Sequence, residues 1–304
     1  MMSFVSVQGL GKSYRGVRAV NDFTFDVRQG EVYALVGPDG AGKSTVIRTL
    51  CGLIDSDTGE ASINGFDCRK QFNHIKPILG YMPQVFSLYP DLTVTENLAF
   101  YGGIYGVVGP EYLERVEYLY RFSNLKPFAD RRAQALSGGM KQKLALSCAL
   151  MHQPKILILD EPTTGVDPLS RRQFWEILLQ LKEEGVTIIV STPYMDEVAR
   201  ADRACFVFRG EKLAEGKPAE LPGLFEGTLY YFDGPPTMET IDRLNRLGDI
   251  RARRFGGGVH VYLKRGITLD EVTPALSEMG FDIKDFNPIK PDLEDCFIQL
   301  MEES

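Results

Sequence analysis

The sequence contains no apolar run long enough to cross a membrane. Its two longest uncharged stretches, Pro77 to Pro90 and Asn97 to Pro110, are interrupted by Gly and Pro and fall short of the roughly 20 apolar residues that a spanning helix needs. The first basic residue is Lys12, so the charged start of a secretory signal peptide is also missing. We therefore expect a chain that stays inside the cell and does not insert into a membrane by itself.

Cysteine is scarce and scattered. The chain has 5 cysteines, an odd number, and no CxxC pair of the kind that binds zinc or forms a redox dithiol. We therefore expect free, reduced thiols at Cys51, Cys68, Cys148, Cys205 and Cys296.

A basic excess is absent as well. The chain has 34 Lys and Arg against 41 Asp and Glu, a net charge of -7. A field of this sign repels phosphate backbones, which argues against sequence-independent binding of nucleic acid. With 304 residues, 44% of them hydrophobic, the chain is long enough for two domains with buried cores that need no disulfide or metal.

Strand and helix patterns alternate through the first two thirds of the chain. Apolar runs at 31–36, 156–159 and 186–190 are typical of buried parallel strands, and the last follows an amphipathic helical segment at 168–184. Right-handed crossovers between such strands place ligand-binding loops at their carboxyl ends, so the predicted fold class is α/β. Further strands are expected at 4–7, 24–27 and 60–63 with a turn at Asn64-Gly65, and an inserted pair of helices at 95–105 and 110–122.

A second pattern follows a connector rich in Gly and Pro. We place the domain boundary near residue 222, which gives domains of 1–221 and 222–304. The order β-α-β-β-α-β predicts a small ferredoxin-like α+β domain with an added terminal helix. Its strands are expected at 228–232, 250–255, 259–263 and 281–286, and its helices at 238–247, 269–279 and 293–301.

A glycine-rich loop follows the strand at 31–36. Gly37-Pro-Asp-Gly-Ala-Gly-Lys-Ser44 matches G-x-x-x-x-G-K-[ST] and opens a helix expected at about 43–53, which predicts a P-loop. Glycines let backbone N–H groups approach the phosphates of a nucleotide, with the helix N-terminus facing the negative charge. Lys43 is expected to reach the β- and γ-phosphates and Ser44 to ligate Mg²⁺. The expected contacts are Gly37, Pro38, Asp39, Gly40, Ala41, Gly42, Lys43, Ser44 and Thr45.

An acidic pair, Asp160 and Glu161, ends the strand at 156–159. A P-loop requires a second acidic element near Mg²⁺, and Asp160 is placed to supply it. Glu161 is then the candidate general base for an attacking water. Without the P-loop, such a pair would more often be an ordinary loop.

A third motif, Leu136-Ser-Gly-Gly-Met140, stands directly before a helical segment. Together with the P-loop and the acidic pair, it resembles the signature motif of the ATP-binding subunits of ABC transporters, which usually ends in Gln where this chain has Met140. The resemblance implies that Ser137, Gly138 and Gly139 contact ATP bound to an opposite subunit. A plain N-cap at Ser137 is equally compatible with the residues.

Other positions follow from the same resemblance. Tyr14 lies where the family has an aromatic residue stacked on adenine, and Gln84 matches the glutamine that touches Mg²⁺ and relays the nucleotide state. Asp167 matches the loop that couples two sites across a dimer. Residues 86–135 resemble the helical subdomain that docks on a membrane permease. Its aromatic residues Phe86, Tyr89, Phe100 and Tyr101 suit either a contact groove or the subdomain core, and core is the safer expectation for most.

One position departs from the family pattern. Where the family has Ser-Thr-His, with a histidine on the γ-phosphate, this chain has Ser191-Thr192-Pro193. Proline offers no side-chain donor and no N–H, and the histidines lie elsewhere, at 74, 152 and 260. Two interpretations stay open: an active site that works without the histidine, and a weakened site beside a more competent partner.

The segment at 291–300, Pro-Asp-Leu-Glu-Asp-Cys-Phe-Ile-Gln-Leu, is similar to the end of ATP-binding subunits of the daunorubicin and multidrug-export group. The expected function is ATP hydrolysis on the inner face of the cell membrane, powering export through a separate permease and a second nucleotide-binding subunit. An ATP-gated module without hydrolysis is the alternative. A soluble ABC protein of DNA repair or translation is disfavoured by one cassette, the acidic balance and the lack of a heptad insertion.

Overall fold

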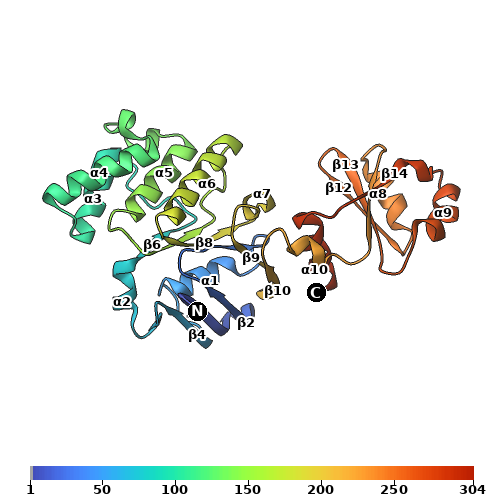
Figure 1. The fold of residues 1–304 in the computed structure, drawn as a ribbon, viewed down its shortest axis with the longest axis horizontal. Helices are drawn as coiled ribbons and strands as arrows, with labels where there is room; N and C mark the ends of the chain where they lie inside the picture. Colours follow the sequence, from blue (N-terminus) through green and yellow to red (C-terminus); the bar gives the residue numbers. More distant parts are fainter. Residues whose placement is uncertain (1–2) are drawn as a thin grey trace. The chain divides into compact units, whose positions relative to one another are not determined.

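The computed structural model describes residues 3–304, which divide into two compact units (Figure 1). The first unit ends at Ala219 and the second runs from Glu220 to Ser304, two residues before the boundary we expected. Among the described residues, no helix has the length and apolar character needed to span a bilayer.

A six-stranded sheet forms the centre of the first unit. Its order is β10-β9-β3-β8-β7-β6, and all neighbours are parallel except the edge strand β10. Every residue of β3, β7 and β8 is buried, as expected for strands covered on both faces. The strands are β3 (Val32–Val36), β6 (Leu79–Met82), β7 (Ile156–Asp160), β8 (Thr187–Thr192), β9 (Arg203–Phe208) and β10 (Glu211–Gly216).

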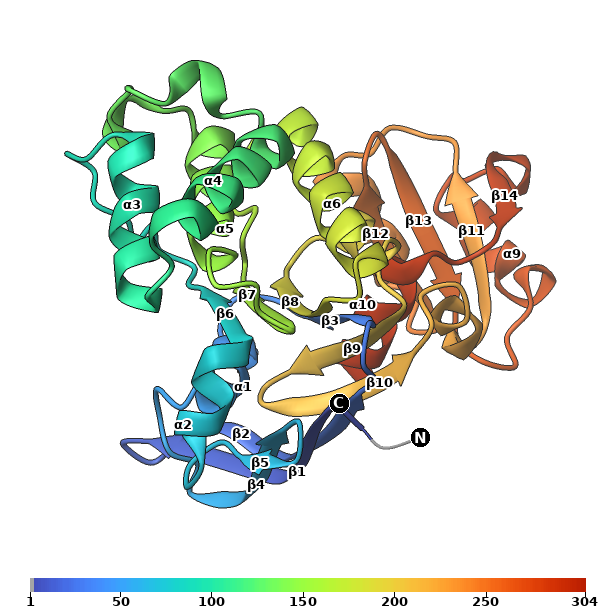
Figure 2. The ribbon, with the colours of Figure 1, turned by 60° about the vertical axis from the view of Figure 1, so that its left-hand side comes forward.

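Two layers cover this sheet. Figures 1 and 2 show α5 and α6 on one side, and α1 with a second, antiparallel sheet of order β2-β1-β4-β5 on the other. The second sheet and α1 share one apolar core with the central sheet, including Phe23, Tyr33 and Ile47. The bounds are β1 (Val5–Tyr14), β2 (Val17–Val27), β4 (Thr58–Ile63), β5 (Phe66–Asp67), α1 (Lys43–Leu50), α5 (Gly138–Ala149) and α6 (Pro168–Glu183).

The predicted helical insertion is present between β6 and α5. Thr93 and Glu96 form a capping box at the start of α3, and Pro110 lies in the first turn of α4, where a missing N–H costs nothing. The helices are α3 (Val94–Tyr105) and α4 (Gly109–Ser123). Two short helices, α2 (Phe72–Ile75) and α7 (Met195–Val198), complete the unit.

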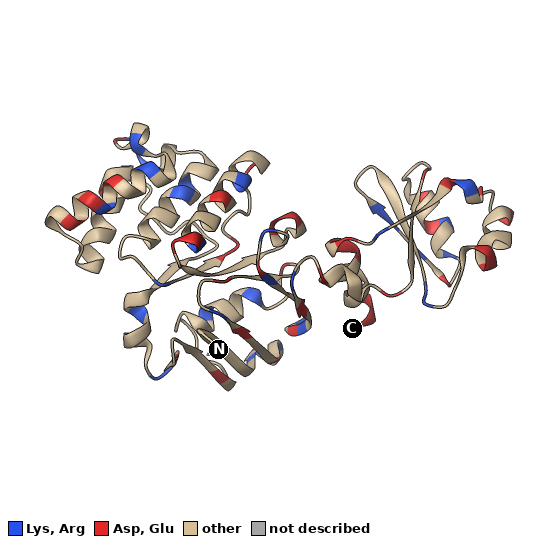
Figure 3. Cartoon of the chain, viewed as in Figure 1, with Lys and Arg blue, Asp and Glu red and all other residues tan. Residues whose placement is uncertain are grey.

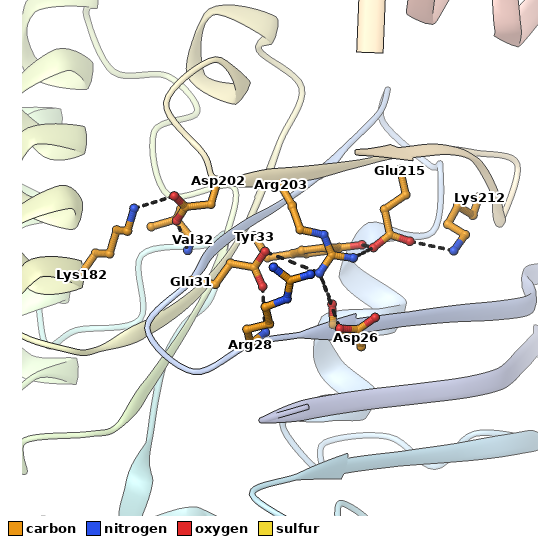
Figure 4. A network of polar contacts seen from close by, with 10 residues as sticks. All are labelled: Asp26, Arg28, Glu31, Val32, Tyr33, Lys182, Asp202, Arg203, Lys212 and Glu215. Atoms are coloured by element: carbon orange, nitrogen blue, oxygen red, sulfur yellow. Dashed lines mark hydrogen bonds and ion pairs between the residues drawn. The ribbon is translucent and has the colours of Figure 1, made fainter. Parts of the chain in front are cut away.

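A polar network joins the two sheets around Arg203 at the start of β9 (Figure 4). Its guanidinium pairs with Asp26 of β2, Glu31 before β3 and Glu215 of β10. The Tyr33 hydroxyl donates to Glu215 at 2.9 Å, and burial raises the pKa of that hydroxyl. Charged side chains here are satisfied by one another, so the contact between sheets is fixed by a network as well as by apolar packing.

The second unit is a four-stranded antiparallel sheet of order β12-β13-β11-β14. Its elements follow in the predicted β-α-β-β-α-β order. Helices α8 and α9 pack against the sheet over a core that includes Phe232, Leu244 and Leu276. The bounds are β11 (Thr228–Phe232), α8 (Met238–Asn245), β12 (Ile250–Phe255), β13 (Gly258–Leu263), α9 (Leu269–Glu278), β14 (Phe286–Ile289) and α10 (Leu293–Glu303).

The strand expected at 281–286 was misplaced. Residues 283–285 form a 3₁₀ turn, and the strand covers 286–289 instead. The Asp282 side chain accepts from the N–H of Lys284 at 3.0 Å, a local bond that holds the chain in a turn before it can pair. Pro288 is tolerated because β14 is an edge strand.

Candidate functional site

The glycine-rich loop leaves β3 and enters α1, as predicted. Gly42 has φ 105, and a Cβ there would stand 2.5 Å from the carbonyl oxygen of Ala19. A Cβ on Gly37 would stand 2.1 Å from the carbonyl oxygen of Val207. These two positions exclude any side chain, which explains why the loop can lie this close to neighbouring backbone.

Lys43 is buried at the mouth of this loop. Its Nζ donates to the carbonyl oxygens of Gly37 at 2.6 Å and Pro38 at 2.9 Å, and it pairs with Glu161 Oε1 at 3.0 Å. The ammonium therefore has two loop carbonyls and a carboxylate as partners, which is the charge compensation that a buried lysine requires. The same geometry places the expected phosphate-binding lysine next to the expected general base.

Asp160 lies below the loop at the end of β7. Its Oδ1 accepts from Ser44 Oγ at 2.9 Å and from Ser191 Oγ at 2.8 Å. Its Oδ2 is buried without a hydrogen-bond partner among residues 3–304. A buried carboxylate oxygen beside a hydroxyl is a donor set that fits a hard divalent cation, so these residues suit Mg²⁺.

Glu161 adopts an unusual backbone conformation, with φ 48 and a side chain 4% exposed. Its N–H donates to Ser191 Oγ at 2.9 Å. Its Oε2 accepts from Gln84 Nε2 at 2.9 Å and from Thr164 Oγ1 at 3.2 Å. A left-handed conformation is costly for a residue with a Cβ, and these partners hold it in place.

Many of the predicted residues line one cavity of 360 Å³, but Gly37, Pro38 and Asp160 do not. Tyr14, half-exposed at the end of β1, Gln84 and Glu161 are part of the lining. The rest of the lining is Ala19, Asp39, Gly40, Ala41, Gly42, Lys43, Ser44 and Thr45. A larger hollow of 850 Å³ between α4, α5 and α6 contains none of the predicted residues, so size alone does not mark the site.

The signature segment lies elsewhere. Ser137 caps α5, accepting from the N–H of Met140 at 3.4 Å, and Gly138 and Gly139 open the helix. A Cβ on Gly139 would approach the Ser170 side chain to 2.6 Å, so close packing requires this glycine. None of the three residues lines the 360 Å³ cavity of its own chain. The N-cap interpretation is observed, and the contact with an opposite subunit stays a prediction.

Asp167 caps α6 and accepts from the N–H of Ser170 at 2.9 Å. Hydrogen bonding from Ser170, through its side chain first and through this N–H second, lowers the pKa of the Asp167 carboxyl. The coupling role implied by the family resemblance stays a prediction.

Three polar residues near Glu161 were not predicted from the sequence. Ser191 joins the Asp160 carboxylate to the Glu161 N–H, Thr164 contacts the Glu161 carboxylate, and Glu197 contacts threonines on both sides of this region. The available signal was the pair Ser191-Thr192, polar and buried at the end of an apolar strand. Its position before Pro193 gave no indication that these hydroxyls contact Asp160 and Glu197.

Comparison with known proteins decides the family. A family model described as ABC transporter matches residues 20–164. Nod factor export ATP-binding protein I of Ralstonia nicotianae is 38% identical over 218 residues, which cover 71% of this chain and 68% of that protein. The chain belongs to the ABC transporter family. It carries that family's ATP-binding cassette.

A further relative matches both units. The probable multidrug ABC transporter ATP-binding protein YbhF of Escherichia coli is 38% identical over 302 residues, 98% of this chain and 52% of that protein. The chain therefore spans about half the length of that relative.

Solved cassettes share the fold. The structure of cbiO1 from Clostridium perfringens, described as part of the ABC transporter complex cbiONQ, has a TM-score of 0.66 at 25% identity and covers 81% of this chain and 96% of that one. The ATP-binding cassette MJ0796, in a dimeric post-hydrolysis state bound to ADP and Pi, has a TM-score of 0.64 at 26% identity and covers 70% and 98%.

Proposed function

We propose that this chain binds and hydrolyses ATP to power an ABC export system. The observation that carries the proposal is the arrangement of Lys43, Gln84 and Glu161 around one cavity lined by the P-loop. The naming of its relatives as export and multidrug ATP-binding proteins supports the direction of transport.

The reaction uses the polar contacts already described. Lys43 exchanges its contact with Glu161 for the β- and γ-phosphates, which frees the Glu161 carboxylate. Glu161 then orients a water and takes its proton as the water oxygen bonds to the γ-phosphorus and the bond to the ADP oxygen breaks. Gln84 and Thr164 keep the carboxylate aimed. Mg²⁺, when held by Ser44, Asp160 and Gln84, supplies positive charge that offsets the charge of the phosphates.

Dimerisation around ATP is part of the proposal. The N-terminus of α5, with Ser137, Gly138 and Gly139, does not line the cavity of its own chain. It is a suitable anion-binding end for a nucleotide held by a second copy or a related subunit. The dimeric MJ0796 structure with ADP and Pi is consistent with such an arrangement.

The proposed partner is a membrane permease, which ATP hydrolysis by this chain would drive. Exposed apolar side chains occur between β6 and α3 and along α3: Val85, Tyr89, Phe100 and Ile104. The Tyr89 and Phe100 rings contact each other, with centres 4.6 Å apart, and their exposure corrects the expectation that they lie in the subdomain core. Apolar surface of this kind is typical of protein contacts. The chain would then act peripherally, on the cytoplasmic face of the membrane.

Nucleic acid is not among the proposed partners. Acidic and basic residues alternate along α4 (Figure 3), and the net charge of the chain is -7. A nucleic-acid-binding face requires clustered positive charge.

A weakened site is the second candidate, and Pro193 is the observation that favours it. Proline has no donor, and the next N–H, of Tyr194, already donates to Thr192 Oγ1 at 3.1 Å. The three histidines do not line the cavity: His74 stacks on Phe66, His152 on Tyr105, and His260 contacts Asp295. In this case the chain would bind ATP and close, while a partner ATPase hydrolyses.

Replacing Lys43 tests the assignment of the nucleotide site. We expect Lys43→Ala to weaken ATP binding and to lower hydrolysis by about 100-fold or more, because the ammonium is the main positive charge in the cavity. Nucleotide titration by fluorescence and steady-state phosphate release measure the two effects, with the exposed Lys70, which does not line the cavity, replaced by Ala as the control. Unchanged binding and turnover in Lys43→Ala would refute the assignment.

A further inference from the structure

Glu197 is a buried carboxylate that the reaction above does not use. It lies on α7, 2% exposed, four residues after Pro193. Its Oε1 accepts from Thr163 Oγ1 at 2.6 Å and its Oε2 from Thr192 Oγ1 at 2.6 Å. Both threonines are themselves buried, and each hydroxyl donates its proton to this carboxylate.

The two threonines belong to segments that flank Glu161. Thr163 lies two residues after Glu161 in the loop 161–167, and Thr192 ends β8, directly before Pro193. Glu197 therefore joins the loop that carries the candidate base to the turn where the family resemblance places a histidine. Replacing Glu197 would free both segments at once.

Arg171 attaches a third segment, the first turn of α6. Its Nη2 lies 3.6 Å from Asp196 and its guanidinium lies 4.3 Å from the Tyr194 ring centre. Its Nη1 is 3.9 Å from Glu197 Oε1, too far for a hydrogen bond but close enough to offset the buried charge. Arg171 thus offsets the charge of the Glu197 carboxylate, and both hydrogen bonds from the threonines are kept.

We propose that Glu197 is a positioning residue for Glu161: by binding Thr163 and Thr192 it holds the loop 161–167 against the turn at Pro193. A proline turn cannot anchor this loop through a donor of its own at residue 193, and the buried carboxylate supplies the anchor from the far side of the turn. The strained backbone of Glu161 needs such external support, because its conformation is unfavourable by itself.

The effect on turnover rests on the proposed ATP hydrolysis. Loss of the two hydrogen bonds to Glu197 leaves the P-loop intact, but the Glu161 carboxylate is no longer held beside the attacking water. We expect Glu197→Ala to lower kcat by about 10- to 100-fold while KM for ATP stays within about threefold. Thr163→Val, which removes one hydroxyl, should act in the same direction, and Thr163→Ser should restore the wild-type rate.

Asp196→Ala is the matched control. It removes a neighbouring carboxylate on the same helix that pairs with the same Arg171, but Asp196 is exposed and contacts neither threonine. We expect its kinetics to match wild type.

Hydrogen–deuterium exchange tests the anchor without relying on hydrolysis. Glu197→Ala and Thr163→Val should speed amide exchange in peptides covering 161–167, where Thr164 and Val166 now donate within the loop, and Asp196→Ala should not. Unchanged exchange there in both variants, or kcat equal to that of Asp196→Ala, would overturn the inference. If the wild-type chain does not hydrolyse ATP, the proposed function fails, and the exchange result still decides the role of Glu197.

Discussion

Glu161 is held by more polar contacts than its local sequence would suggest. The partners come from four separate parts of the chain: Lys43 and Gln84 in two segments before it, Thr164 within its own loop, and Ser191 after it. A strained residue persists only when its surroundings fix it in this way, and such residues gather at functional sites. The strain therefore supports the assignment of Glu161 independently of the motif.

The five cysteines give a prediction about the reactivity of individual side chains. All five are buried and free, and burial raises the pKa of Cys68 and Cys205 to about 12 and that of Cys296 to about 11. A thiol of pKa 11 is about 0.1% ionised at pH 8, and the thiolate is the reactive form. We expect negligible fast labelling by a disulfide reagent in the native protein and five equivalents after unfolding. One rapid equivalent at pH 8 in the native chain would contradict this.

Arg203 connects several strands, so its replacement gives a prediction about how secondary-structure elements are held together. Its partners Glu31 and Glu215 are 7% and 15% exposed (Figure 4). Removing the guanidinium leaves the buried Glu31 carboxylate with the Arg28 N–H, while Glu215 keeps Lys212 and the Tyr33 hydroxyl. We expect Arg203→Met to lower the free energy of unfolding by about 3 kcal/mol, as for other broken buried pairs. Chemical denaturation measures the loss.

The control for Arg203 is an exposed ion pair. Arg69 and Asp55 are 3.3 Å apart, with both side chains 64% exposed. Arg69→Met should change stability by less than about 1 kcal/mol, because solvent screens such pairs. Equal losses in the two variants would show that the Arg203 network adds nothing to the junction of the sheets.

Sequence patterns predicted the elements whose causes are local. The buried strands β3, β7 and β8 are continuous apolar runs, and Asn64-Gly65 has positive φ at both residues, as a two-residue hairpin turn requires. β9 and β10 were not predicted because charged residues at their ends hide the pattern, and these charges are satisfied only in the folded network around Arg203. The strand β14 was predicted too early in the sequence, because the Asx turn formed by the Asp282 side chain has no pattern that separates it from a strand.

The residues of the candidate site also fall into two groups, those that sequence motifs predicted and those that they did not. The P-loop, Asp160 and Glu161 are adjacent to recognisable strand ends, so their meeting at one sheet edge follows from topology. Thr163, Ser191 and Glu197 carry no motif, and their roles depend on contacts between segments 30 to 34 residues apart in the sequence. No local pattern contains that information.

At the scale of the whole molecule, the proposed function takes part of the site from a second nucleotide-binding subunit. The N-terminus of α5 does not line the cavity that holds the P-loop, and Pro193 adds no donor. If the contacts of α5 come from a second copy, turnover depends on association. A rate per chain that rises with protein concentration is then the expected behaviour.

The proposed ATPase is best tested by steady-state ATP hydrolysis over a range of protein concentrations, with wild type, Glu161→Gln and Pro193→His compared. We expect the wild type to hydrolyse ATP with a rate per chain that rises with concentration, and Glu161→Gln to lose about 100-fold or more. A silent wild type that gains activity in Pro193→His, or a Glu161→Gln variant that keeps the wild-type rate, would contradict it.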